Sequence, residues 1–364
     1  MLDRKVTMSG VTTPDESVST GLTTPDIVTF LSNMTGLARE GVTHVAYEAS
    51  SHGLSQFRNE GLPVSAGAFT NLSRDHLDYH ADMDDYFVAK MRLFSEVVSD
   101  GGTAVIWADD AWSERAIAAA RARSLTVFGV GRAGEDICLL SREPGQLGQG
   151  LEIEHQGKRY KVMLPLIGAY QAANALVAAG LVLATGGDAS QVFDALGRLQ
   201  PVRGRLERAV ITAAGVPVYI DYAHTPDALA AAIEALRPHV KGRLITVFGA
   251  GGDRDVGKRA QMGEVAAAHS ELVIVTDDNP RGEDPAAIRL QVLAGAPQAR
   301  EVGDRRAAIR AALDEARAGD IVLVAGTGHE QGQIGGPGEA MRVLPFDDVT
   351  VARECAAELA GASQ

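Results

Sequence analysis

Four clusters in the second half of the chain combine the side-chain types that hold charged ligands. They are Asp221-Tyr222-Ala223-His224, Asp253-Arg254-Asp255, Asp278-Asn279-Pro280-Arg281 and Gly328-His329-Glu330. In the third cluster a carboxylate, an amide and a guanidinium share a turn stiffened by proline, which suits a zwitterionic amino acid. A capped turn with a surface arginine is the alternative for this cluster. Glu330 adds an acceptor for the hydrogens of an amine.

The run 248–259 comes within one residue type of a loop that binds nucleoside triphosphates. Gly252, Gly257 and Lys258 keep the spacing G-x-x-x-x-G-K, but Arg259 stands where a Ser or Thr hydroxyl must reach Mg²⁺. The run therefore predicts an anion site rather than the ATP loop. No other segment of the sequence has the complete phosphate-loop pattern.

Lys90 lies at the centre of the apolar face predicted for a helix over 83–98. An ammonium there is costly unless it is paired, neutralised or chemically altered. Alternatively, its four-carbon stem reaches the surface, which is the commoner arrangement. Upstream, His76 and His80 are four positions apart, so on a helix they would share a face and, with Glu48, could bind a cation. A surface helix with two histidines is the alternative.

The segment Glu48-Ala49-Ser50-Ser51-His52-Gly53 also contains a serine and a histidine close together. It lacks the G-x-S-x-G elbow that exposes the serine nucleophile of an α/β-hydrolase. A hydrolase is therefore a weak hypothesis for this chain.

Alternating strand and helix patterns predict the elements that position these clusters. In the second half, strands over 216–220, 244–248, 272–276 and 321–325 alternate with helices such as 226–236 and 305–316. This order predicts a parallel, doubly wound sheet, whose ligands bind at the carboxyl ends of the strands. The four clusters follow four strands, so we expect one shared crevice.

The first half has its own set of elements. A helix is predicted after Thr24, which would cap it with Pro25 at the first position. Strands follow over 42–48, 66–72 and 103–107, and a hairpin over 151–154 and 160–164 turns around 156–158. We therefore predict an α/β protein with two domains, 1–204 and 205–364.

The bulk composition limits the classes of partner. The formal charge of −13 on 364 residues argues against binding to nucleic acid or to membrane surfaces. Cys138 and Cys355 are far apart, which supports neither a disulfide framework nor a zinc site. Without a predicted leader or membrane span, the expected setting is the cytoplasm and the expected partners are small molecules.

Eight stretches in series resemble the Mur ligase family, and within it the ligases that add meso-2,6-diaminopimelate to UDP-N-acetylmuramoyl-L-alanyl-D-glutamate in peptidoglycan precursor synthesis. The stretches are EASSHGLSQFR at 48–58, FTNLSRDHLDYH at 69–80, AK at 89–90, PVRGR at 201–205, DYAHTPD at 221–227, GGDRD at 251–255, DNPR at 278–281 and GTGHE at 326–330. They span almost the whole chain. The resemblance implies a central ATPase-type domain with a parallel sheet, incomplete at its start, followed by a Rossmann-like C-terminal α/β domain.

The resemblance also implies a role for individual residues. Glu48, His76 and Lys90, the last as an N6-carboxylysine carbamate, would act in catalysis and hold Mg²⁺. The UDP-muramoyl-dipeptide would contact Thr23, Thr24, Ser50, Gln56 and Arg58. Residues on the nucleotide side would be Asn174, Arg205, Asp221 and His224. Diaminopimelate would be bound by Arg254, Asp278, Asn279, Pro280, Arg281, Gly326 and Glu330.

By the same resemblance, ATP phosphorylates a substrate carboxylate and the incoming amine displaces the phosphate to form an amide. Arg281 would bind the distal carboxylate of diaminopimelate, because ligases that add lysine meet an ammonium at that position. The chain departs from the family at three places: it has no phosphate loop, Thr327 stands for a usual Lys, and Gln171 stands for a usual Asn.

The missing phosphate loop leaves three functional hypotheses open. One is a diaminopimelate-adding ligase whose chain lacks its N-terminal part and is inactive alone. Another is a non-catalytic remnant that binds diaminopimelate or the muramoyl peptide without ATP. The third is a related ligase that adds lysine or glutamate.

Overall fold

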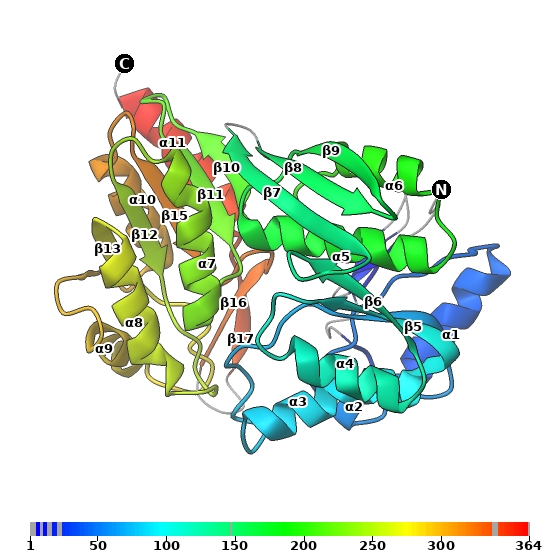
Figure 1. Cartoon of the computed structure of the whole chain (residues 1–364). Coiled ribbons are helices and arrows are strands. Elements are labelled where there is room, and N and C mark those ends of the chain that lie inside the picture. The colour runs from blue at the N-terminus through cyan, green and yellow to red at the C-terminus, as the bar shows by residue number, and fades with distance from the viewer. Residues whose placement is uncertain are drawn as a thin grey trace.

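The computed structural model shows two α/β lobes lying side by side (Figure 1). It describes residues 24–145, 148–336 and 341–362, together with the backbone of three short strands nearer the N-terminus. These short strands form an antiparallel sheet of their own: β1 (Lys5–Thr7), β2 (Gly10–Thr12) and β3 (Ser17–Ser19).

The first lobe is built on a six-stranded sheet in the order β4-β5-β6-β7-β8-β9. Its strands are β4 (Val64–Phe69), β5 (Val98–Trp107), β6 (Thr126–Gly131), β7 (Ile137–Gly145), β8 (Gly148–His155) and β9 (Lys158–Leu164). β4 to β7 run parallel, while β7, β8 and β9 form antiparallel pairs. The helices are α1 (Ile27–Arg39), α2 (Ser51–Ser55), α3 (Met83–Arg92), α4 (Ser113–Ala122), α5 (Ala169–Ala184) and α6 (Ala189–Leu196).

The second lobe has a six-stranded sheet in the order β10-β11-β15-β12-β13-β14. Its strands are β10 (Glu207–Ile211), β11 (Pro217–Asp221), β12 (Leu244–Phe248), β13 (Leu272–Val275), β14 (Arg300–Glu301) and β15 (Ile321–Ala325). All neighbours are parallel except β10 and β11. The helices are α7 (Pro226–Leu236), α8 (Lys258–His269), α9 (Pro285–Leu293), α10 (Arg305–Glu315) and α11 (Asp348–Ala362). β16 (Gly332–Gly335) pairs antiparallel with β17 (Arg342–Pro345).

Helices cover both faces of each sheet, so each lobe has two layers of apolar core. In the second lobe, α7, α8 and α9 pack on one face, and α10 and α11 pack on the other. In the first lobe, α5 and α6 pack on one face and α3 and α4 on the other. The strand order places β15 between β11 and β12, which makes the carboxyl ends of these strands the topological switch point where α/β sheets bind ligands.

Most elements expected from the sequence are present. β12, β15 and α7 have the predicted bounds, and the hairpin of β8 and β9 turns at Gln156 and Gly157 as expected. Two expectations are wrong. Residues 42–48 form no strand, and the cap of α1 is Asp26, whose carboxylate accepts from the backbone N–H groups of Val28 and Thr29. Thr24 instead bonds to the segment that was expected to be the strand.

The helix predicted over 83–98 divides into two parts. α3 ends at Arg92, and a turn of π-helix over Leu93–Val97 leads into β5. Within the described ranges, no helix is both long and apolar enough to cross a membrane.

Candidate active site

The loop that carries His76 leaves β4 and turns back before α3. His76 has a left-handed backbone, with φ of 55°, and its ring packs edge-on against His52 and Tyr86 with centroids 4.9 and 5.7 Å away. Burial lowers the pKa of His76 to about 4 despite the opposing charge of Asp75. The imidazole is therefore neutral at physiological pH and has a lone pair available for a cation.

Glu48 and Lys90 attract each other electrostatically, and the charge of Lys90 also lowers the pKa of His76. Removal from water lowers the pKa of Lys90, and Glu48 only partly offsets this effect. Its Nζ lies 5.0 Å from the centre of the Tyr86 ring. Desolvation also raises the pKa of Glu48, against the opposing effects of Arg205 and Lys90. Desolvation of Glu48, His76 and Lys90 favours the neutral form of each.

The donor set fits Mg²⁺ only if Lys90 carries an oxygen. Among the described residues, no three His, Cys, Asp or Glu side chains form a group that could hold a metal. Glu48 and His76 would supply two ligands, whereas an ammonium at Lys90 would repel a cation. A carbamate on Lys90 would supply the hard oxygen that Mg²⁺ prefers. A lowered pKa increases the fraction of a lysine that is the neutral amine, which is the form that reacts with CO₂.

The residues predicted for the muramoyl peptide form one hydrogen-bonded group beside this site. Thr24 Oγ1 donates to the Glu48 carbonyl at 3.0 Å and accepts from Ser50 N at 3.1 Å. Arg58 Nη1 donates to the Thr24 carbonyl at 2.9 Å, and Arg58 Nη2 donates to Gln56. The Ser50 hydroxyl caps α2 by accepting from Gly53 N. The structure thus brings Thr24, Ser50, Gln56 and Arg58 together, while Thr23 lies outside the described residues.

The two lobes meet through charged side chains next to His76. Asp75 Oδ2 lies 3.2 Å from His224 Nε2, and Asp75 Oδ1 lies 3.4 Å from Lys258 Nζ. Burial opposes ionisation of Asp75, but His224, Lys258 and His76 hold its pKa well below the usual range. His224 Nδ1 faces the Tyr222 carbonyl at 2.8 Å, so both nitrogens of His224 have partners within the protein.

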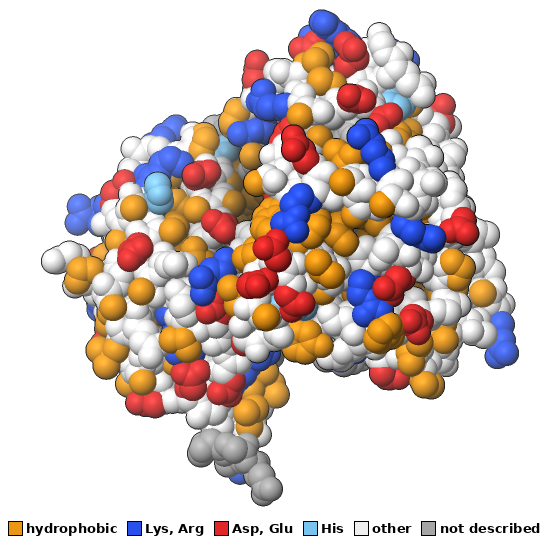
Figure 2. All heavy atoms as spheres, turned by 60° about the horizontal axis from the view of Figure 1, so that its bottom comes forward, with side chains coloured by type: hydrophobic (Ala, Val, Ile, Leu, Met, Phe, Trp, Pro, Cys, Tyr) orange, Lys and Arg blue, Asp and Glu red, His pale blue; other side chains and the backbone are white. Residues whose placement is uncertain are grey.

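Two further pairs extend this contact between the lobes. Arg74 Nε donates to Asp255 Oδ2 at 2.9 Å, and Arg254 Nη1 lies 3.9 Å from Asp78 Oδ2. The loop that carries His76 therefore contacts the glycine-rich run that carries Arg254, one of the predicted amino-acid-side residues. Figure 2 shows a hollow between the two parts of this face, with acidic and basic side chains on both of its sides.

The glycine-rich run between β12 and α8 was expected to bind an anion, but two of its cations, Lys258 and Arg259, bind groups of the protein instead. Lys258 is buried and contacts Asp75, and Arg259 is buried in bonds to Glu283, Gln291 and the Gly251 carbonyl. These contacts neutralise both cations within the protein. Arg254 keeps 47% of its side chain exposed, so it is the side chain of the run best placed to meet an anionic ligand.

The turn after β13 lies against the loop after β15. Asn279 Nδ2 donates to Glu330 Oε2 at 2.7 Å, and Asn279 Oδ1 accepts from Ile334 N at 2.7 Å. Burial raises the pKa of Glu330, and the charge of Asp278 adds to this effect. Asp278 Oδ1 accepts from Asn279 N, while Oδ2 is buried and has no hydrogen-bond partner in the described part of the chain. A buried carboxylate oxygen of this kind can still accept a hydrogen bond from water or from a ligand.

Arg281 completes this turn with a left-handed backbone, φ 50°. Its backbone pairs with the segment around β16, and its Nη1 donates to the carbonyls of Gly252 and Asn279 at 2.9 and 3.3 Å. Burial and the neighbouring Arg254 both lower the pKa of Arg281. Two guanidinium groups that repel each other form a favourable site for a carboxylate.

Gly326 and Pro280 contribute backbone shape rather than side-chain chemistry. Gly326 has φ of 120°, and a Cβ there would lie 2.3 Å from Asp278 Oδ2. A Cβ on Gly252 would lie 1.9 Å from the Pro280 carbonyl, so the glycine-rich run packs directly on the turn. Only glycine permits these approaches.

Two of the predicted nucleotide-side residues, Arg205 and Asp221, lie at the segment that joins the lobes. The carboxylate of Asp221 accepts from Leu206 N, Ala223 N and the Tyr170 hydroxyl at 2.7, 2.8 and 3.1 Å. Arg205 lies over the Tyr222 ring, with 4.6 Å between the guanidinium carbon and the ring centre. Asp221 therefore fastens the start of α5 to β11 through its internal bonds. Asn174 is an exposed residue of α5.

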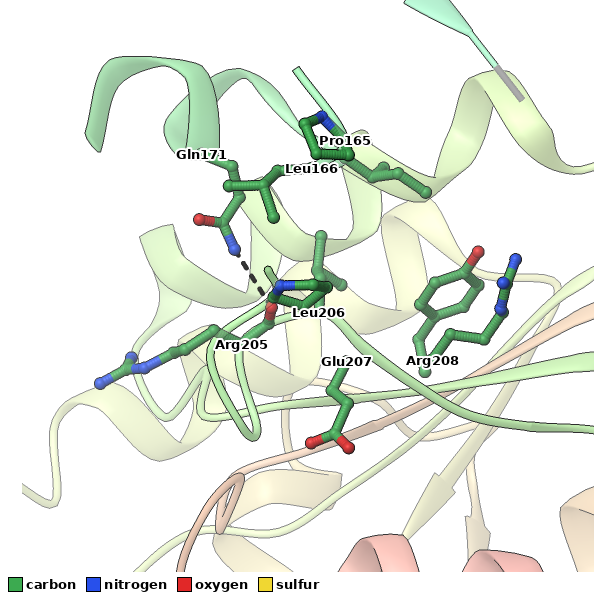
Figure 3. Close-up of a pocket in the computed structure, with 10 residues that line it drawn as sticks. Pro165, Leu166, Gln171, Arg205, Leu206, Glu207 and Arg208 are labelled. Carbon is green, nitrogen blue, oxygen red and sulfur yellow. Dashed lines mark hydrogen bonds between the residues drawn. The ribbon is translucent and has the colours of Figure 1, made fainter. Parts of the chain in front are cut away.

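A pocket of about 330 Å³ opens at this junction, between the segment before α5 and the start of β10. Gln171 Nε2 donates to the Arg205 carbonyl at 3.1 Å, and the Arg205 guanidinium extends away from Gln171 (Figure 3). The departure at Gln171 thus has a structural role, since its amide holds the joining segment. The pocket is lined by Pro165, Leu166, Ile167, Gln171, Pro201, Arg205, Leu206, Glu207, Arg208 and Tyr219.

The serine and histidine pair has a different arrangement from the one considered for a hydrolase. His80 Nε2 lies 3.0 Å from Ser51 Oγ, and His80 Nδ1 lies 3.4 Å from Asp85. Ser51 and His80 are only 2% and 3% exposed, so a substrate cannot reach the hydroxyl. Residues 76–80 form turns, so His76 and His80 do not share a helix face.

Sequence reasoning missed Asp75, Tyr170 and Lys258 as parts of this site. Asp75 lies in the stretch 69–80 and Lys258 in the run 248–259. Their pairing joins the two lobes, and the spacing of residues within either stretch cannot predict it. Tyr170, in the stretch before Asn174, could have been noticed as the aromatic hydroxyl that reaches Asp221.

Comparisons with known proteins agree with this architecture. Residues 1–182 match the Mur ligase middle domain, and residues 204–328 match the Mur ligase glutamate ligase domain. The UDP-N-acetylmuramoyl-L-alanyl-D-glutamate–2,6-diaminopimelate ligase of Zymomonas mobilis is 60% identical over 95% of this chain and 71% of its own length. The same ligase from Bradyrhizobium diazoefficiens is 56% identical over 93% of this chain and 70% of its own length.

Solved structures give the same result. A UDP-N-acetylmuramoyl-L-alanyl-D-glutamate–2,6-diaminopimelate ligase is 32% identical and superposes with a TM-score of 0.64, covering 98% of this chain and 73% of the other. Folylpolyglutamate synthase of Mycobacterium tuberculosis, at 21% identity and a TM-score of 0.69, shares the fold over 89% of this chain and 81% of its own. From the two matched domains and the relatives of high identity, we conclude that this chain belongs to the Mur ligase family.

Proposed function

We propose that the protein is the ATP-dependent ligase that joins meso-2,6-diaminopimelate to UDP-N-acetylmuramoyl-L-alanyl-D-glutamate in peptidoglycan precursor synthesis. The observation that carries the proposal is the turn at 278–281, where Asp278 Oδ2 is buried without a hydrogen-bond partner among the described residues. This carboxylate lies near Glu330 and Arg281, and Arg281 has Arg254 as a neighbour. This arrangement offers acceptors for an amine and cations for a carboxylate. Relatives of 60% and 56% identity that carry this name support the same substrate.

Each group of residues has a separate task in this proposal. Asp278 Oδ2 and Glu330 accept hydrogens from an amine of diaminopimelate, while Arg254 and Arg281 bind its distal carboxylate. The group around Thr24 and Arg58 holds the muramoyl peptide. Asn174, Arg205, Asp221 and His224 serve the nucleotide side. Asp221 acts through its bond to the joining segment, and His224 acts through its contact with Asp75 of the first lobe.

The reaction follows from this placement. The γ-phosphoryl group of ATP passes to the glutamate carboxylate of the muramoyl peptide, which leaves ADP and an acyl phosphate. The amine then attacks the acyl carbon, inorganic phosphate leaves with the electrons of the C–O bond, and the amine loses a proton. Glu48, His76 and the carbamate of Lys90 would hold Mg²⁺, which neutralises charge on the crowded phosphate oxygens when bound.

The test is an amide-forming assay of the full-length protein, with meso-diaminopimelate and L-lysine compared as the incoming amino acid. With ATP and the muramoyl dipeptide, we expect kcat/KM for meso-diaminopimelate to exceed that for L-lysine by about tenfold or more, because lysine leaves the two arginines unpaired. A preference for lysine would contradict the substrate assignment. Binding of diaminopimelate without ADP formation would support the non-catalytic alternative instead.

A further inference from the structure

Arg305, the first residue of α10, is a fully buried arginine that no part of the proposed reaction uses. Its Nε and Nη2 donate to the two carboxylate oxygens of Asp348 at 2.8 and 2.7 Å. Neither side chain of this pair has any exposed surface. A buried ion pair is weak evidence of a contribution to stability, so its other contacts are more informative.

The remaining donors of Arg305 reach the ends of two strands. Nη2 donates to the carbonyl of Ala325, the last residue of β15, at 3.0 Å. Nη1 donates to the carbonyl of Asp277, just beyond β13, at 3.3 Å. The next residues in the chain are Gly326 and Asp278. One rigid guanidinium therefore holds together the residues that immediately precede the turn at 278–281 and the loop at 326–330.

Thr327 brings a residue of the loop itself into this unit. Its hydroxyl donates to Asp348 Oδ2 and accepts from Arg305 Nη2 at 3.3 Å. The Cβ that Gly326 lacks would lie 3.9 Å from Arg305 Nη2 as well as 2.3 Å from Asp278 Oδ2. The Arg305 guanidinium thus lies directly behind the surface that carries Asp278 and Glu330.

We propose that Arg305, held by Asp348 and Thr327, is the positioning residue that sets the distance between the turn at 278–281 and the loop at 326–330. It thereby determines how tightly the two segments hold an amino acid bearing a second amine and carboxylate. The inference rests on the proposed function, because that function places the amino acid between these segments. Arg305 itself touches no substrate.

The test removes the buried pair without leaving a lone charge. In Arg305→Met/Asp348→Leu, apolar side chains of similar length replace both ions, a change that often leaves stability unaltered. Binding of meso-diaminopimelate to the 364-residue chain is measured by calorimetry, and hydrogen exchange is measured at 278–284 and 326–336. We expect binding weaker by about tenfold or more and faster exchange in both segments.

Arg243→Met is the matched control. Arg243 donates to Asp320 at 2.8 Å just before β12 and β15, which is the opposite end of the same sheet. Its substitution should leave binding within about twofold of wild type. If the double variant and wild type bind equally, the positioning role is wrong. If wild type itself fails to bind, the proposed function is wrong and this inference falls with it.

If the double variant does not fold, Thr327→Val tests the positioning role of Arg305 instead. It keeps the shape of the side chain and removes only the hydroxyl that links the loop to Asp348 and Arg305. We expect binding weaker by about threefold or more with the fold retained. Unchanged binding in this variant would overturn the proposal.

Discussion

The Lys258 ammonium lies 3.4 Å from the Asp75 carboxylate, although 183 positions separate them in the sequence. Lys258 begins α8 in the second lobe, and Asp75 precedes His76 in the first. His224 contacts the same carboxylate from the second lobe. The loop that carries His76, a predicted metal ligand, therefore contacts two side chains of the second lobe, one of which, His224, is a predicted nucleotide-side residue.

The first prediction concerns this contact. Lys258→Met keeps the length of the side chain but leaves Asp75 with His224 as its partner across the lobes. We expect the free energy of unfolding to fall by about 1–3 kcal/mol, less than for a buried charge left wholly unpaired. Urea denaturation measures it. Arg123→Met, which breaks an exposed pair with Asp100, should change stability by less than about 0.5 kcal/mol. Equal losses of stability in both variants would show that the Lys258–Asp75 contact stabilises the fold no more than an exposed ion pair does.

The second prediction concerns the choice of amino acid. Arg281→Met removes one of the two guanidinium groups assigned to the distal carboxylate. We expect affinity for meso-diaminopimelate to fall by about 1.5–3 kcal/mol, while the weak affinity for L-lysine stays nearly constant. Calorimetric titration of both amino acids measures the difference. A parallel loss for both ligands would show that Arg281 shapes the turn instead of binding the carboxylate.

The third prediction concerns pH. The pKa of His76 is lowered by burial to about 4 from an ordinary value of 6.5. Between these values the unfolded chain binds a proton that the folded chain does not, so stability falls as the pH drops through this window. Unfolding measured from about pH 7 to about pH 5 should show a steeper loss in wild type than in His76→Asn, since asparagine tolerates the left-handed backbone. If stability depends on pH equally in wild type and in His76→Asn, the lowered pKa of His76 is wrong.

The fourth prediction concerns Lys90. Its lowered pKa increases the fraction of neutral amine, which reacts reversibly with CO₂ to give a carbamate and a proton. In ¹³C-bicarbonate, we expect a carbamate resonance in wild type, strengthened by Mg²⁺, and none in Lys90→Met. Lys158→Met, at an exposed lysine of β9, is the control and should keep the signal. A signal that persists in Lys90→Met would place the modification elsewhere.

The fifth prediction concerns Gly326. Gly326→Ala places a Cβ 2.3 Å from Asp278 Oδ2 at a φ of 120°, so both the loop and the carboxylate must move. We expect a loss of stability of about 1–3 kcal/mol and weaker binding of diaminopimelate. Gly36→Ala is the matched control. Apart from the neighbouring residues and the backbone of α1 itself, nothing lies within 4 Å of the added carbon, so this variant should gain up to about 1 kcal/mol. Similar outcomes in both would argue against a strained glycine in the loop.

The sequence alone determined the second lobe in most respects. Its strands are short apolar runs buried on both sides, and β12 and β15 were therefore placed with their correct bounds. Parallel strands put their carboxyl ends at one edge, so the convergence of Asp278 and Glu330 also followed from order and spacing. The motifs that resemble the Mur ligases were sufficient to identify the family.

Tertiary structure decided which charged groups pair and which remain available to ligands. The segment 42–48 has a strand-like composition, yet it forms no strand, because strand propensity depends on the neighbours a segment finds in the fold. Lys258 has the spacing of a phosphate-binding lysine, but the first lobe supplies Asp75 and neutralises it. Arg305 has no motif at all, and only the meeting of α10, α11 and two strand ends gives it partners. Such pairings depend on distances in space between residues far apart in the chain, which local pattern cannot encode.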